Sequence, residues 1–167
     1  SLLKTEFEAY DFRLHPFTER LHPINILKKL IKKVADIEKT PLLEVGVLPE
    51  PSIKEAKQKD HFGYIFSGLI NVPEDGVYIF QTRSMMVGFD IGNELVVNND
   101  GAHAAIPATG YIALEKGFHP YILYYFEDYE GEHLSWFWKL PFCKGISTDS
   151  YFSLVCKIIN DIMPWKK

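Results

Sequence analysis

The sequence predicts an all-β chain, folded as an antiparallel β-sandwich of the jelly-roll type. Aromatic residues make up 14% of the 167 residues, and such side chains favour the pleated, half-buried surface of a sheet. Between residues 61 and 142, short apolar runs recur roughly every 8–12 residues with glycine- or proline-containing turns between them, as in sandwiches and barrels. With 47% hydrophobic and 24% charged residues, a single domain of this length can bury a substantial core.

The strands of this region are predicted from apolar runs bounded by turn residues. The runs at 63–72 and 77–84 flank Pro73-Glu74-Asp75-Gly76, and this arrangement predicts a hairpin. Further strands are predicted at 88–92, 94–99, 111–117, 118–128 and 133–142, with a turn at Asn99-Asp100-Gly101. We expect roughly 8–11 strands in all.

Two of these strands show which side chains should be covered. Residues 118–126 are apolar on both faces of the strand, so we expect both faces to be largely buried. Trp136 and Trp138 share one face with Leu134 and Leu140, which favours a place in the core. An exposed platform for stacking sugar rings is the alternative for the two tryptophans.

The first 60 residues are less regular. Residues 6–12 predict a first strand, and residues 42–52 predict an extended segment bounded by prolines. Residues 25–38 predict a small flanking helix, because apolar residues recur at helical spacing and Lys28, Lys29, Lys32 and Lys33 fall on the opposite face. Those lysines form either a solvated face or a contact for an anionic partner. The tail at 151–163 is apolar and is either helical or extended.

Charge and cysteine content exclude several classes of protein. The net charge is −4, and residues 61–167 carry 7 Lys and Arg against 12 Asp and Glu, so we expect no nucleic-acid partner. We also expect no membrane span and no signal sequence, as in a mature or excised piece of a protein. Cys143 and Cys156 lack CxxC spacing, and they form either a disulfide or two buried thiols.

No catalytic motif is evident in the sequence. GxSxG, HExxH, GxGxxG and P-loop patterns do not occur, so we predict that the chain is not itself an enzyme and uses no cofactor. Glu127, Asp128, Glu130 and Glu132 cluster between two predicted strands. This cluster is a solvated turn, an acid/base pair or half of a calcium site. An independent enzyme that uses the acidic loop therefore stays open as an alternative.

Three segments carry a family resemblance: "FSGLINVPEDGVYIFQTRS", "GFDIGNELVVNNDGAH" and "GYIALEKGFHPYILYYFE". They resemble the protective-antigen fourteen-kilodalton domain family (PA14), in particular the type attached to bacterial glycoside hydrolases. The resemblance implies a β-sandwich over about residues 36–152, preceded by an extension or first strand plus helix at 1–35 and followed by a tail at 153–167. It also implies an accessory module of a glycan-processing protein.

The resemblance fails at the calcium motif. Sugar-binding members of the family have two adjacent aspartates after the second hairpin strand, and these bind Ca²⁺. Here the corresponding positions are Ser84 and Met85, followed by Met86 where the family usually has glycine. A thioether is not a ligand for this hard cation, so we predict no metal site. The two methionines either fill a gap in the core or contact a partner domain.

Together these observations predict a lectin-like, calcium-independent carbohydrate-binding module that is not catalytic, in a secreted, periplasmic or cell-surface protein. The expected partners are a glycan or polysaccharide and an adjacent domain of a larger protein. The predicted ligand-binding residues lie in two loops: Asn98, Asn99, Asp100 and His103 in one, and Asp128, Tyr129 and Glu130 in the other. A hydrogen-bonded turn is the alternative for Asn99 and Asp100. A structural or protein-interaction domain without sugar binding is the alternative for the whole chain.

Overall fold

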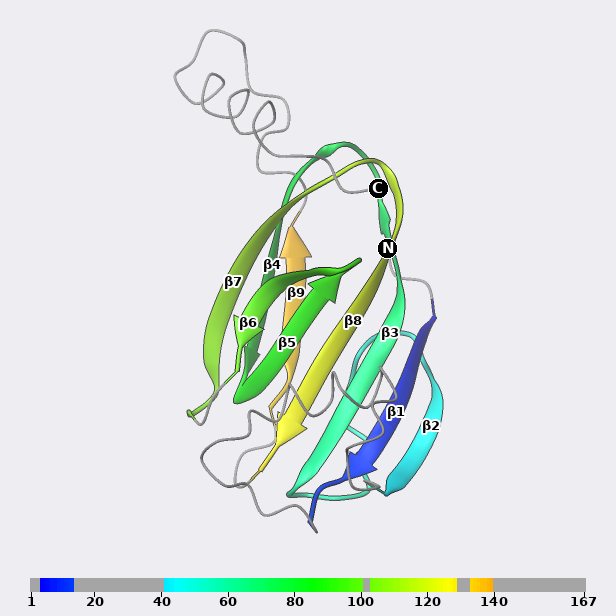
Figure 1. Ribbon diagram of the computed structural model, residues 1–167, viewed down its shortest axis with the longest axis vertical. Coiled ribbons are helices and arrows are strands. Elements are labelled where there is room, and N and C mark those ends of the chain that lie inside the picture. Colours follow the sequence, from blue (N-terminus) through cyan, green and yellow to red (C-terminus); the bar gives the residue numbers. More distant parts are fainter. Residues whose placement is uncertain (1–3, 14–40, 101–102, 129–132, 140–167) are drawn as a thin grey trace, which may run out of the picture.

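The computed structural model describes residues 4–13, 41–100, 103–128 and 133–139, which form two facing β-sheets (Figure 1). No helix long and apolar enough to cross a membrane lies within these ranges. The predicted helix at 25–38, the tail at 151–163, Cys143 and Cys156 all fall outside them. The strands are β1 (Thr5–Asp11), β2 (Leu42–Leu48), β3 (Phe62–Val72), β4 (Gly76–Ser84), β5 (Met86–Ile91), β6 (Glu94–Asn99), β7 (Ile106–Leu114), β8 (Gly117–Glu127) and β9 (Ser135–Lys139).

The predicted all-β sandwich is confirmed. The larger sheet has six strands in the order β2-β1-β3-β8-β5-β6, and the smaller sheet has three in the order β7-β4-β9. Every paired strand is antiparallel to its neighbour. The longest pairing joins β3 to β8, whose residues 62–72 and 117–127 match one for one. This central pair fixes the register of the larger sheet.

The predicted hairpin of β3 and β4 is wrong. The turn at Pro73-Glu74-Asp75 carries the chain from one sheet to the other, so that β3 pairs with β1 and β8 while β4 pairs with β7 and β9. A turn that contains proline and Asp-Gly reverses the chain both in a hairpin within one sheet and in a connection between two sheets. The outcome is decided by the distant strand β8, whose apolar side chains pair along the whole length of β3.

Aromatic side chains fill most of the space between the sheets. Phe80, Phe89 and Tyr121 are each 1% exposed. Two tryptophans of β9 extend into the same layer: the ring of Trp138 stacks on that of Phe80 with centroids 6.1 Å apart, and the ring of Trp136 stacks on Tyr121 at 6.2 Å. Both tryptophans therefore pack against the core, as their shared face with leucine predicted.

The strand β8 is covered on both faces, as its sequence predicted. Tyr121, Leu123 and Tyr125 point between the sheets. Tyr124 and Phe126 point the opposite way, to the outer face of the larger sheet, where they belong to a second apolar cluster. The buried members of this outer cluster are Phe12, Ile65, Met86, Tyr124 and Phe126.

The two sheets come into close contact at Gly110 of β7. A Cβ atom at this position would lie 1.8 Å from the carbonyl oxygen of Val96 in β6, so only glycine fits. This contact brings β7 against β6 and closes one side of the sandwich. The segment between these two strands, which holds the first predicted ligand loop, therefore starts and ends on closely packed strands.

Candidate functional site

The candidate site lies at one end of the sandwich, which we call the rim. Strands β1, β4, β6 and β8 end there, and β2, β3, β5, β7 and β9 begin there. The register places Asn99 opposite Val87, and Val87 opposite Tyr125. The ends of β6 and β8 are therefore two strands apart, about 10 Å. The two predicted ligand loops begin at the same end of the molecule.

The first loop follows β6, and its asparagines are used by the scaffold. Asn99 is 4% exposed, and its side-chain amide donates hydrogen bonds to the carbonyl oxygens of Ser84 (3.1 Å) and Ile106 (3.0 Å). Asn98 is exposed, and its Oδ1 accepts a hydrogen bond from the backbone N–H of Asp100 at 3.2 Å. The alternative reading, a hydrogen-bonded turn, thus describes both asparagines.

Two other predicted residues of this loop are an acid and a histidine. Asp100 and His103 are both partly exposed. Nδ1 of His103 lies 2.8 Å from the carbonyl oxygen of Ala104, so it donates to that oxygen and the loop orients the ring. Gly101 and Ala102 fall outside the described residues. A carboxylate and an imidazole are therefore presented at the rim beside β6.

The second loop follows β8, and its first residue forms a pair that the sequence did not reveal. Asp128 Oδ1 lies 2.8 Å from Nδ1 of His61, and the backbone N–H of His61 donates to the carbonyl oxygen of Asp128 at 3.2 Å. Both side chains are about 40% exposed, at 42% for His61 and 40% for Asp128. Tyr129 and Glu130, the other predicted residues, lie outside the described ranges.

His61 holds an unusual backbone conformation. Its φ is +54°, in the left-handed region that β-carbons disfavour and that histidine adopts more readily than most residues. The carbonyl oxygen of His61 accepts hydrogen bonds from the N–H of Phe12 (2.7 Å) and from Nε2 of Gln58 (3.1 Å). These bonds fix the backbone at the start of β3. The ring is therefore held against Asp128 by the fold.

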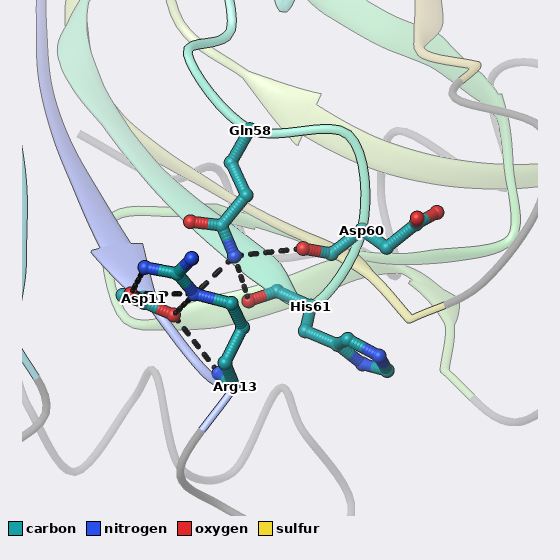
Figure 2. Close-up of polar contacts among 5 residues, drawn as sticks. All are labelled: Asp11, Arg13, Gln58, Asp60 and His61. Carbon is teal, nitrogen blue, oxygen red and sulfur yellow. Dashed lines mark hydrogen bonds and ion pairs between the residues drawn. The ribbon is translucent and has the colours of Figure 1, made fainter.

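The buried carboxylate of Asp11 forms hydrogen bonds that stabilise the chain next to His61 (Figure 2). The Asp11 side chain is 8% exposed and accepts hydrogen bonds from the guanidinium of Arg13 and from Nε2 of Gln58. The hydrogen bonds from Arg13 are the main reason that the pKa of Asp11 is lowered to about 2. Gln58 also donates to the carbonyl oxygen of Asp60 at 2.8 Å. This network ties β1 and residues 58–61 together behind the His61–Asp128 pair.

The residues that we expect in place of a calcium motif are largely buried. Ser84 is fully buried at the end of β4, and its hydroxyl has no hydrogen-bond partner in the part of the chain that the structure describes. Met85 is half-buried and packs on the outer apolar cluster, and Met86 is a 5% exposed member of it. Of the two readings of these methionines, the structure favours burial. Within the described ranges, no three His, Cys, Asp or Glu side chains are grouped to hold a metal.

Comparison with known proteins agrees with the resemblance in the sequence. Residues 48–127 match the PA14 domain. The PA14 match runs from the last residue of β2 to the last residue of β8, so it includes Asn98, Asp100 and His103 and stops one residue before Asp128. The strands β1 and β9 lie outside the match, although each pairs directly with a strand inside it.

Two solved structures share a limited likeness with the chain. The β-glucosidase from Kluyveromyces marxianus in complex with glucose is 17% identical, with a TM-score of 0.46 over 72% of this chain and 14% of that chain. The selenomethionine-labelled β-glucosidase from the same yeast is 15% identical, with a TM-score of 0.43 over 72% of this chain and 12% of that chain. The chain thus spans only a small part of each β-glucosidase. No curated protein matches it.

Proposed function

We propose that the chain is a non-catalytic carbohydrate-binding module that works without calcium and binds its glycan at the rim. The PA14 match supports an accessory role of this kind. The observation that carries the proposal is the register of the larger sheet, which brings the polar ends of β6 and β8 to the same end of the sandwich, two strands apart. Asp100, His103 and Asp128 are partly exposed there.

These groups suit the hydroxyls of a sugar. A carboxylate accepts hydrogen bonds from hydroxyls, and an imidazole donates or accepts them. The bond between His61 and Asp128 orients the Asp128 carboxylate before any ligand arrives, which lowers the entropy cost of binding. Because each hydrogen bond contributes only about 0.5–1.5 kcal/mol net, we expect dissociation constants on the order of high micromolar to millimolar.

The proposal extends to the protein that carries the module. An accessory module with weak affinity is useful when it keeps a glycoside hydrolase or another glycan-processing domain near its polymer. We therefore propose that the chain is a lectin-like module joined to such a domain in a secreted, periplasmic or cell-surface protein. Tyr129 and Glu130 remain proposed contacts of the second loop.

A glycan array tests the proposal. We expect selective binding to a small set of polysaccharides or oligosaccharides, unchanged by millimolar EDTA because we expect Ser84 and Met85 to occupy the positions of two Ca²⁺-binding aspartates. Binding that EDTA abolishes would contradict the calcium-independent mechanism. An array without any specific signal would favour a structural domain, the reading supported by the local hydrogen bonds of Asn98 and Asn99.

A further inference from the structure

The edge strand β2 exposes a row of apolar side chains. Leu42, Val45 and Val47 are 55%, 60% and 56% exposed. Among the described residues β2 pairs only with β1, so the other side of its backbone is open to pairing. From residue 44 to residue 48 it has no lysine, proline or bulge, which are the usual features that keep an edge strand from pairing with another chain.

Two carboxylates lie next to these valines on the outer face of the larger sheet. Glu6 of β1 is opposite Val47, and Glu8 is opposite Val45. Together with Ile65 of β3 they line a shallow trough of about 560 Å³. The trough thus has an apolar floor and a negatively charged centre.

The two glutamates give this trough a negative charge. Within the described part of the chain, neither Glu6 nor Glu8 forms an ion pair, whereas Glu44 on the same sheet pairs with Lys57 at 3.2 Å. Glu8 accepts a hydrogen bond from the Tyr10 hydroxyl at 2.5 Å, which orients the carboxylate but leaves its charge in place. A partner with positive charge would gain from both carboxylates.

We propose that the β2 edge binds an extended basic segment of another polypeptide, which adds to the larger sheet as a further strand. Main-chain hydrogen bonds to β2 would supply much of the affinity. The aliphatic stems of its Lys or Arg side chains would pack on Val45 and Val47, and its apolar side chains would alternate with them on the inner face of the sheet. Its Lys or Arg side chains would extend across these valines, with their charged ends at Glu6 and Glu8, since neighbouring strands are only about 4.8 Å apart.

Charge decides between this partner and a second copy of the chain. Two copies that paired through β2 would place Glu6 and Glu8 of one molecule and the same two residues of the other in one sheet, separated by the two β2 strands. Their like charges would repel one another at low salt, and the second copy would neutralise neither glutamate. A basic segment has the complementary charge, so it is the occupant that the surface fits.

The test uses the whole chain and two synthetic peptides of about nine residues, the length of a long strand. One peptide alternates valine with lysine, and the other alternates valine with glutamate. For the lysine peptide we expect NMR shift changes confined to β1 and β2 and slower hydrogen exchange of β2 amides. We expect it to bind about fivefold more tightly than the glutamate peptide at low salt, with the difference reduced in 1 M NaCl.

The double variant Glu6→Lys and Glu8→Lys should reverse this preference, while Glu94→Lys on the opposite edge strand β6 should leave it unchanged. Both positions of the double variant are exposed, so its melting temperature should match that of the parent. The proposal is overturned if the lysine peptide does not bind, if its shifts lie outside β1 and β2, or if the double variant keeps the original preference. A dimer that forms through β2 in sedimentation equilibrium would also overturn it.

Discussion

The two ends of the sandwich use their polar side chains differently. At the end opposite the rim, the hydrogen bonds of the turn residues are made with backbone groups: the Asp75 carboxylate accepts from the N–H of Lys116 at 2.7 Å, and the Tyr78 hydroxyl donates to the carbonyl oxygen of Glu74 at 2.7 Å. At the rim, side-chain bonds join distant segments, such as His61 with Asp128 and Gln58 with Asp11. The rim therefore combines braced backbone with exposed polar groups, which a binding site needs.

If the rim is braced as described, its apolar residues stabilise the fold and do not bind a metal. Met86→Asp should lower the free energy of unfolding by about 3–5 kcal/mol, because it leaves an uncompensated charge in an apolar cluster. Met86→Leu, which conserves volume, should cost less than about 1.5 kcal/mol. Urea denaturation measures both changes. Equal stabilities of the aspartate variant and the parent would show that Met86 does not stabilise the rim.

The second-largest loss of stability should come from replacing Asn99, whose side-chain amide is buried in the first loop. Asn99→Ala removes two hydrogen bonds and leaves the carbonyl oxygens of Ser84 and Ile106 without this donor, so we expect a loss of about 2–3 kcal/mol. Asn98→Ala at the exposed neighbouring position should cost less than about 1 kcal/mol. If the two variants unfold at the same urea concentration, Asn99 is not the anchor of this loop.

The brace behind the rim should make stability depend on acid pH. Folding lowers the pKa of Asp11 from 3.8 to about 2, mainly through hydrogen bonds from Arg13. The stability contributed by this ionised group is therefore present above about pH 4 and is lost as the pH falls toward 2, by on the order of 1–2 kcal/mol. Asp11→Asn should lose less stability than the parent over this interval. Parallel stability curves for the two proteins would contradict the role of this carboxylate.

The end opposite the rim should show the smallest stability effect. Tyr78→Phe removes one hydrogen bond to a backbone carbonyl in a turn, so we expect a loss of about 1 kcal/mol. Thermal denaturation followed by circular dichroism measures it. A loss as large as that of Asn99→Ala would mean that the two ends are braced equally, and the comparison would fail.

Much of the fold could be predicted from local patterns. The alternation in residues 118–126 correctly placed apolar side chains on both faces of β8, and the leucines beside Trp136 and Trp138 correctly indicated the core. The partner of β3 could not be predicted in this way. A turn such as Pro73-Glu74-Asp75 has the same composition whether it joins paired strands or two sheets, and only contacts distant in sequence decide between them.

For the candidate site, the sequence indicated which loops carry polar residues but not which of their side chains contact one another. The sequence indicated Asp100, His103 and Asp128 because polar residues cluster between predicted strands. It gave no sign that His61 lies against Asp128, because that pair depends on the antiparallel register of β3 and β8. Asn98 and Asn99 were predicted to bind a ligand, but their side chains make local hydrogen bonds. The sequence could not separate these roles, because an asparagine side chain can hydrogen-bond either to a turn or to a ligand.

Retention in affinity electrophoresis, on a polysaccharide that the glycan array identifies, tests the central claim most directly. Asp100→Ala and Asp128→Ala should each abolish retention while changing the melting temperature little, because both side chains are partly exposed at the rim. Asp75→Asn, a carboxylate change at the other end, should be retained as strongly as the parent. If both rim variants bind like the parent, or if Asp75→Asn alone loses retention, the glycan does not bind at the rim and the account is wrong.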